Sequence, residues 1–148
     1  MTTPSPRRPR ARATAAKPSS ARRPRLPKAI GVAVDAALGR KATEVVVLDL
    51  RKSDAFTDFF VIATGASARQ VHAIADAVET ALKAEQVRPS NVEGYKRAEW
   101  VLLDYFDFVV HVFSPAARNF YGLERLWGTA KHIVIEDPEP PGTERRGS

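Results

Sequence analysis

Residues 43–71, TEVVVLDLRKSDAFTDFFVIATGASARQV, contain two apolar strand patterns followed by the start of a helix. The runs at 43–50 and 58–65 are rich in β-branched and aromatic side chains and have the length of strands. Their nearly continuous apolarity is typical of strands that are covered on both faces of a sheet. Ser67 is a natural N-cap, and the apolar residues after it recur at helical spacing: Val71, Ile74, Ala75, Val78 and Leu82. This stretch therefore predicts an α/β fold.

The sequence on either side adds one helix and three strands. Pro27 suits the first turn of a helix, which would end at Gly39. Residues 91–94, NVEG, indicate a short strand, and residues 99–105 and 108–113 indicate two strands joined by a tight turn. That turn lacks the Gly or Asn that tight hairpins favour. We therefore expect a hairpin whose register the turn does not specify.

A last helix is predicted to begin at Ser114, which suits the N-cap position, followed by Pro115 at the first helical position. This helix would end at Gly128, and its apolar stripe would consist of Phe120, Leu123 and Trp127. Trp127 is expected in the core. The complete order of elements predicts a single-domain α/β fold, with a mixed sheet of roughly four to five strands flanked by helices.

Charge and composition divide the chain into a folded unit and two ends. Nine of the 23 Lys and Arg residues lie within residues 1–28, which contain no acid, and the other 14 stand against 17 Asp and Glu. The remainder of the chain is therefore net −3, which is not typical of a domain that reads duplex nucleic acid. Residues 1–26 and 136–148 have too few apolar side chains to offset the entropy of ordering and are predicted to be disordered. We expect the folded domain over residues 27–135.

Composition also excludes several classes of protein and site. The chain has no Cys, so disulfides, thiolate zinc sites and Cys nucleophiles are excluded. No apolar run approaches the roughly 18–20 residues that span a bilayer, so no membrane association is expected. The Arg-rich N-terminus is similar to an organellar transit peptide, but the six prolines from Pro4 to Pro27 oppose the amphipathic helix of such a peptide. We therefore expect a cytoplasmic protein, and bacterial or organellar origin stays open.

No group of residues predicts a metal site or acid–base catalysis. Asp76 and Glu79 lie on the polar face of the helix that follows Ser67, where they look like solvated charges. Asp104 and Asp107 flank the hairpin turn, and turns favour Asp without any metal. The three histidines occur at no spacing typical of metal ligands: His72, His111 and His132. We interpret the second of them, inside VVHVF, as a half-buried strand residue with one hydrogen bond.

The turn ATGAS, residues 63–67, leaves an enzymatic interpretation open. Gly65 and Ser67 lie between a strand and a helix N-terminus, where backbone amides and the helix dipole could hold a phosphate. The turn lacks the Lys of a P-loop and the three-glycine spacing of a dinucleotide site. A strand–turn–helix junction also needs a Gly and a capping Ser for structural reasons. A nucleotide-dependent transferase is therefore the alternative to a binding protein.

Six stretches of the chain, in this order and spacing, resemble one known family. They are EVVVLDLR (44–51), DFFVIATGASARQV (58–71), VEGY (92–95), EWVLLDY (99–105), VVHVF (109–113) and FYGLERLWG (120–128). Over about residues 28–128 the chain resembles the ribosomal silencing factors, or Iojap-like proteins. The family usually has Gly at the position of Phe106, so the tip of the hairpin departs from the family pattern.

The resemblance implies a nucleotidyltransferase-like topology without the catalytic motif, no cofactor, no enzymatic activity and often a homodimer. It implies binding to the large ribosomal subunit at its protein that faces the small subunit, which blocks subunit association and represses translation. The contact surface maps onto one strand: Trp100, Val101, Leu102, Leu103, Asp104 and Tyr105. From the residues alone, the first of these suits either the core or an interface, because Trp is common in both.

The basic arm, residues 1–26, lies outside the resemblance. Its cations would release counterions beside a polyanion, so we expect a weak, salt-sensitive attraction to ribosomal RNA. An RNA-binding protein that acts through the arm alone is a third interpretation, which the acidic remainder of the chain makes less favourable.

Overall fold

The computed structural model describes residues 26–135 of the 148. The predicted arm and the predicted tail, residues 136–148, lie outside the described residues, except for Leu26, which packs against the core. Between residues 26 and 135, no helix is long and apolar enough to cross a membrane.

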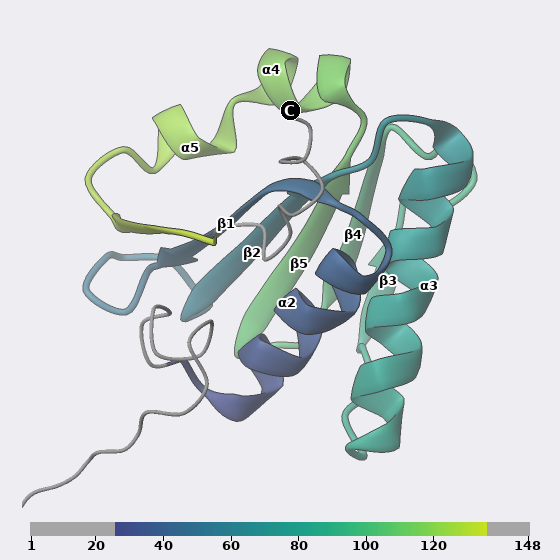
Figure 1. The fold of residues 1–148 in the computed structure, drawn as a ribbon. Coiled ribbons are helices and arrows are strands. Elements are labelled where there is room, and N and C mark those ends of the chain that lie inside the picture. Colours follow the sequence, from purple (N-terminus) through teal and green to yellow (C-terminus); the bar gives the residue numbers. More distant parts are fainter. Residues whose placement is uncertain (1–25, 136–148) are drawn as a thin grey trace, which may run out of the picture. The chain divides into compact units, whose positions relative to one another are not determined.

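A mixed sheet of six strands forms the centre of the structure (Figure 1). In chain order the strands are β1 (Thr43–Asp49), β2 (Phe59–Thr64), β3 (Asn91–Glu93), β4 (Trp100–Asp104), β5 (Phe108–Phe113) and β6 (Lys131–Val134). Across the sheet the order is β3-β4-β5-β2-β1-β6. The central strands β2 and β5 run parallel, and every other pair is antiparallel. The α/β class and the mixed sheet are confirmed, and the sheet has one strand more than the upper end of the predicted range.

The additional strand is β6, which the sequence did not predict. It pairs with β1 from Val46 opposite Val134 to Asp49 opposite Lys131. As an edge strand it buries only Ile133 of its own residues, so it carries neither a long apolar run nor a long alternation. Its strand conformation depends on pairing with β1, and the local sequence pattern contains no signal for a pairing partner.

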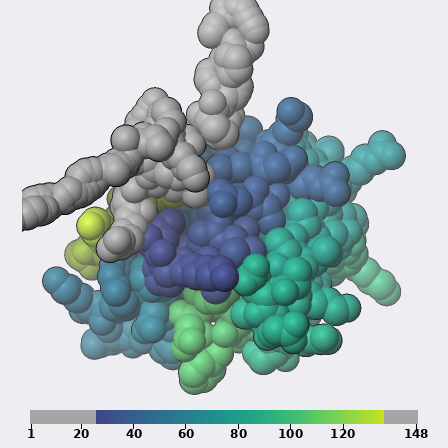
Figure 2. Space-filling view, turned by 60° about the horizontal axis from the view of Figure 1, so that its bottom comes forward, coloured from purple at the N-terminus to yellow at the C-terminus, as the bar shows by residue number. Residues whose placement is uncertain are grey.

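Two long helices cover one face of the sheet (Figure 1): α2 (Lys28–Gly39) and α3 (Ala68–Ala84). Figure 2 shows residues of α2, in purple and blue, directly beside those of α3, in teal. The predicted N-cap is confirmed, because the Ser67 hydroxyl accepts a hydrogen bond from the Gln70 amide at 3.1 Å. The predicted stripe of α3 is fully buried, and each Val, Ile or Leu side chain in it contributes about 1.5–3 kcal/mol by burial.

The opposite face of the sheet is covered by shorter segments. From α4 (Pro115–Tyr121) and α5 (Leu123–Leu126), Ala117 and Leu123 join the buried cluster on this side. Trp127 packs against the cluster, with its ring edge-to-face to Phe60 at a centroid distance of 6.0 Å. β2 is buried along its whole length, as predicted, whereas β1 is buried only from Val45 to Leu48. β5 is also buried throughout, and β4 alternates between buried and half-buried residues.

The prediction of one continuous helix from Pro115 to Gly128 was wrong. Gly122 has left-handed backbone angles, with φ 55°, and its amide donates to the Arg118 carbonyl, which ends α4 before α5 begins. The change of direction removes Phe120 from the apolar stripe, and its side chain is 78% exposed. A glycine in this conformation commonly ends a helix, so the break has a local cause.

The tip of the β4–β5 hairpin holds a bulky residue in a conformation that favours glycine. Phe106 has φ 74°, and its side chain is 76% exposed. Two hydrogen bonds hold the backbone there: the Phe106 amide donates to Asp104 Oδ1 at 2.9 Å, and the Thr57 hydroxyl donates to the Phe106 carbonyl at 2.9 Å. Neighbouring loops therefore hold the strained residue in place.

We predict that Phe106→Gly is more stable than Phe106→Ala by about 1 kcal/mol, because only the alanine keeps the steric cost of positive φ. Both substitutions remove the same exposed ring, so each serves as the control for the other. Urea unfolding of the two variants measures the difference. Equal stabilities would contradict the left-handed conformation at this position.

Candidate functional site

The six residues of the predicted contact surface, which lie on β4 and directly after it, fall into two environments. Val101, Leu103 and Tyr105 are at most 7% exposed and belong to the core cluster under α2 and α3. Burial also raises the pKa of the Tyr105 phenol well above its usual range. Trp100 and Leu102 are half-buried and pack against the cluster on the opposite face. The alternation of a strand therefore brings two of the apolar residues, and the half-buried Asp104 with them, to a partly open face.

Trp100 is both anchored and partly exposed on this face. Its indole Nε1–H donates to His111 Nδ1 at 3.0 Å. Its ring lies 5.1 Å from the Phe113 ring and 4.6 Å from the Tyr121 ring, centroid to centroid. Tyr121, at the end of α4, is itself 48% exposed. The two aromatic side chains thus form one continuous apolar surface beside the open part of β4.

His111 is buried in the middle of the sheet at 3% exposure, deeper than the half-buried position predicted. Burial lowers the pKa of its imidazole to about 3, so the ring is neutral near pH 7. Within the described part of the chain, its Nε2 has no hydrogen-bond partner. A buried polar group without a partner lowers the stability of the fold by about 1–3 kcal/mol, so a histidine is less favourable at this position than an apolar side chain that fills the same space.

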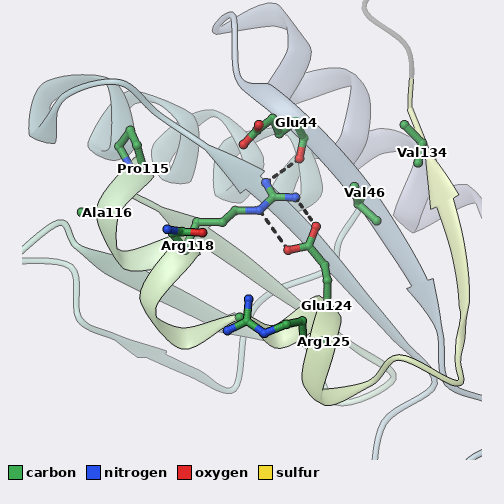
Figure 3. Close-up of a pocket in the computed structure, with 10 residues that line it drawn as sticks. Glu44, Val46, Pro115, Ala116, Arg118, Glu124, Arg125 and Val134 are labelled. Atoms are coloured by element: carbon green, nitrogen blue, oxygen red, sulfur yellow. Dashed lines mark hydrogen bonds and ion pairs between the residues drawn. The ribbon is translucent and has the colours of Figure 1, made fainter.

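Arg118 ties α4 to the rest of the domain (Figure 3). Its guanidinium forms a two-point ion pair with Glu124, Nη2 to Oε2 at 2.6 Å and Nε to Oε1 at 3.2 Å. It also donates to the Thr64 hydroxyl at 2.8 Å and to the Glu44 carbonyl. The side chain is 8% exposed, so these bonds are largely shielded from water. One arginine therefore joins α4, the helix that ends at Tyr121, to β1, to β2 and to α5.

A surface depression of about 760 Å³ lies beside this arginine, lined by Glu44, Val46, Pro115, Ala116, Arg118, Asn119, Gly122, Glu124, Arg125 and Val134 (Figure 3). The positive charge of its buried cation is already paired with Glu124. The sequence analysis missed this cluster. Its local signal was an Arg and a Glu six residues apart on either side of a helix-ending glycine, but nothing in the pattern identified the more distant partners.

The turn with Gly65 and Ser67 makes contacts with neighbouring residues of the chain itself. A Cβ on Gly65 would lie 2.9 Å from the Val71 backbone nitrogen, so close packing requires the glycine. Ser67 caps the helix, and Gln70 Oε1 accepts from the Ala66 amide at 2.7 Å. These contacts account for the glycine and the serine without a phosphate.

The candidate acids and histidines make local contacts. The Tyr95 hydroxyl donates its proton to the Asp76 carboxylate, whose two oxygens lie 2.9 and 3.0 Å from the hydroxyl oxygen. Imidazole nitrogens of His72 and His132 lie within hydrogen-bond distance of the Tyr95 and Ala130 carbonyls, respectively. Within residues 26–135, no group of three or more His, Asp or Glu side chains could hold a metal ion.

Comparison with known proteins identifies the family of this chain. A family model described as "Ribosomal silencing factor during starvation" matches residues 23–148. The chain belongs to the family of ribosomal silencing factors. The resemblance seen in the sequence is thereby confirmed, and residues 99–105 lie inside the matched range.

Relatives of this silencing-factor chain occur in bacteria and in organelles. A ribosomal silencing factor of Halalkalibacterium halodurans is 40% identical over 105 residues, which cover 71% of this chain and 90% of that protein. A chloroplastic Iojap protein of Arabidopsis thaliana is 35% identical over 103 residues, covering 68% of this chain and 43% of that protein. A crystal structure of a Chromobacterium violaceum protein superposes with a TM-score of 0.67 at 36% identity, covering 76% of this chain and 95% of that one.

We predict that Arg118→Met lowers the free energy of unfolding by about 2–3 kcal/mol. The methionine retains much of the apolar stem but leaves the Thr64 hydroxyl, the Glu44 carbonyl and the Glu124 carboxylate without their donor. Arg125→Met, on the exposed side of α5, is the matched control and should change stability by less than about 0.5 kcal/mol. Denaturant unfolding compares the two, and equal small effects would mean that the buried ion pair is not formed.

We also predict that His111 makes the fold sensitive to acid. The folded-state pKa of about 3 lies below the ordinary value of 6.5, so the unfolded chain takes up the proton first as the pH falls. The stability contributed by the neutral ring is complete above about pH 6.5 and is lost as the pH falls toward 3. Between pH 6 and pH 4 the native chain should lose about 1 kcal/mol per pH unit more than His111→Asn. Parallel stability curves for the two proteins would contradict this burial.

Proposed function

We propose that this chain represses translation by binding the large ribosomal subunit, at the protein that faces the small subunit, and thereby prevents the two subunits from joining. Membership of the silencing-factor family supports a role on the ribosome. The observation that carries the site is the half-buried side of β4, where Trp100 lies beside the exposed Tyr121. The chain would act as a non-enzymatic translation repressor, by occupancy.

The open side of β4 suits a protein partner for physical reasons. Trp and Tyr are favoured interface anchors, because each offers a large area with few rotatable bonds to freeze. An aromatic anchor typically loses about 2 kcal/mol or more of binding free energy on truncation to Ala. Leu102 extends the apolar surface, and Asp104 adds a charge at the far end of the strand. We propose these residues, with Trp100, as the contact surface.

The other three residues of the predicted surface would contribute indirectly. Val101, Leu103 and Tyr105 are packed under the two long helices, and exposing them would require β4 to leave the sheet. We therefore propose that they support the position of the contact strand rather than touch the partner.

The wider setting belongs to the same proposal. We propose a cytoplasmic protein that can form a homodimer, with the basic arm of residues 1–26 adding a salt-sensitive attraction to ribosomal RNA. The arm lies outside the described residues, except for Leu26, so its charge alone supports this part. Deleting it should flatten the dependence of ribosome binding on salt concentration, whereas the domain itself would still bind.

We predict that the native chain sediments with purified large subunits in a sucrose gradient and reduces the yield of whole ribosomes when small subunits are added. Trp100→Ala should weaken both effects at least about tenfold in the concentration required, corresponding to the loss of one aromatic anchor. Phe56→Ala is the matched control, because this ring is 83% exposed but lies in the loop between β1 and β2.

Equal losses for the two variants would contradict β4 as the contact strand. A native chain that neither binds large subunits nor reduces whole ribosomes would contradict the occupancy mechanism altogether. A test for stabilisation by a nucleoside triphosphate with Mg²⁺ would then decide whether the Gly65–Ser67 turn binds nucleotide after all.

A further inference from the structure

We propose that His111 is a positioning residue for ribosome binding: its neutral imidazole holds the Trp100 indole by the N–H, so that the docking surface presents an apolar ring. The partner would then meet this ring with an apolar recess rather than with a hydrogen-bond acceptor. This inference rests on the proposed function, and it adds a residue that itself has no access to the partner.

The direction of the hydrogen bond fixes the state of the histidine. An indole N–H only donates, so His111 Nδ1, 3.0 Å away, must be the acceptor. An accepting Nδ1 carries no proton, so the neutral ring must hold its proton on Nε2. Nε2 is the buried atom for which the described residues provide no partner. The ring therefore makes its one hydrogen bond to Trp100, and its other nitrogen is left without a partner among the described residues.

The register of the sheet explains why these two residues meet. Trp100 pairs with Phe113, and Leu102 pairs with His111, so the indole and the imidazole are diagonal neighbours on one face of β4 and β5. Diagonal neighbours in an antiparallel pair are within reach of long aromatic side chains. Phe60 of β2 closes the other side, edge-on to the imidazole at a centroid distance of 4.4 Å. The imidazole thus has little room to turn away from the indole.

Filling space alone would not require a histidine here. A phenylalanine ring could pack among the same aromatic neighbours and would have no unpaired ring nitrogen of its own, but it would leave the Trp100 indole N–H without an acceptor. What the imidazole adds is an acceptor that points at the indole. With its N–H bound, Trp100 can rest on Phe113 and Tyr121 in one orientation before any partner arrives. Such preorganisation lowers the entropic cost of binding.

The first test needs only the free protein. Nitrogen-15 NMR of His111 should show an unprotonated Nδ1 and a protonated Nε2 near pH 7, with scalar coupling from the Trp100 indole N–H across the hydrogen bond to Nδ1. A proton on Nδ1, or rapid exchange of the Trp100 indole N–H with solvent, would overturn the proposal. This outcome does not depend on whether the protein binds ribosomes.

The second test is a double-mutant cycle, measured as affinity for purified large subunits. His111→Phe removes the acceptor and should weaken binding about tenfold, whereas His111→Asn, which keeps an acceptor oxygen near the position of Nδ1, should lose less. Trp100→Phe removes the donor. In that background, adding His111→Phe should change the affinity by less than about twofold, because the histidine acts through the indole.

Each outcome separates the two proposals. Equal losses from His111→Phe in both backgrounds would show a structural role and overturn the positioning role. Failure of the native chain to bind large subunits would overturn the proposed function, and with it any role of His111 in binding, while leaving the NMR result on the hydrogen bond intact. If His111→Phe does not fold, His111→Leu, which also lacks an acceptor, takes its place in the native and Trp100→Phe backgrounds and gives the same decision.

Discussion

Unequal cover of the two faces of the sheet is the constraint on which the other features of this domain depend. Both long helices lie on one face, so the residues of β2, β4 and β5 that point that way are buried. The opposite face has only the short α4 and α5 and the segment that follows them. Over β4, the helices of this face extend no further than Tyr121, which contacts Trp100. Beyond this point the side chains of β4 themselves form the protein surface. The half burial of Trp100 is therefore a consequence of this geometry, independent of its proposed role in binding.

The short helices stay in place because polar bonds supplement a small apolar contact. Arg118 reaches the carbonyl of Glu44, where a bulge in β1 shifts the register and the backbone has φ 51°. A lone buried guanidinium would be costly, but Glu124 neutralises its charge with near-parallel hydrogen bonds. The ion pair thus specifies where α4 lies more than it adds net stability. That position determines how far Tyr121 extends the surface of Trp100.

Sequence patterns predicted the parts of this fold that obey a local rule. A continuous apolar run predicted β2, and a capped apolar stripe predicted α3, because each pattern reflects how that element itself is buried. β6 escaped because it depends on pairing with β1. Phe120 was misplaced because one glycine changed the direction of the helix. The Arg118 cluster could not be foreseen, since its contact with Glu44 joins residues 74 positions apart. Likewise, all six residues from Trp100 to Tyr105 were candidates until the two faces of the sheet were known.

The proposal of a binding protein agrees with the contacts at the ends of the two parallel strands. β2 and β5 are parallel neighbours, and the helices that follow them cover opposite faces, which is the arrangement where open α/β sheets usually bind ligands. Here Thr64, at the end of β2, binds Arg118, and the Gly65 amide donates to the Phe113 carbonyl. Ser114, after β5, caps α4. The protein's own groups thus occupy the place where an enzyme of this architecture would keep its ligand, and the proposed contact surface on β4 lies elsewhere on the sheet.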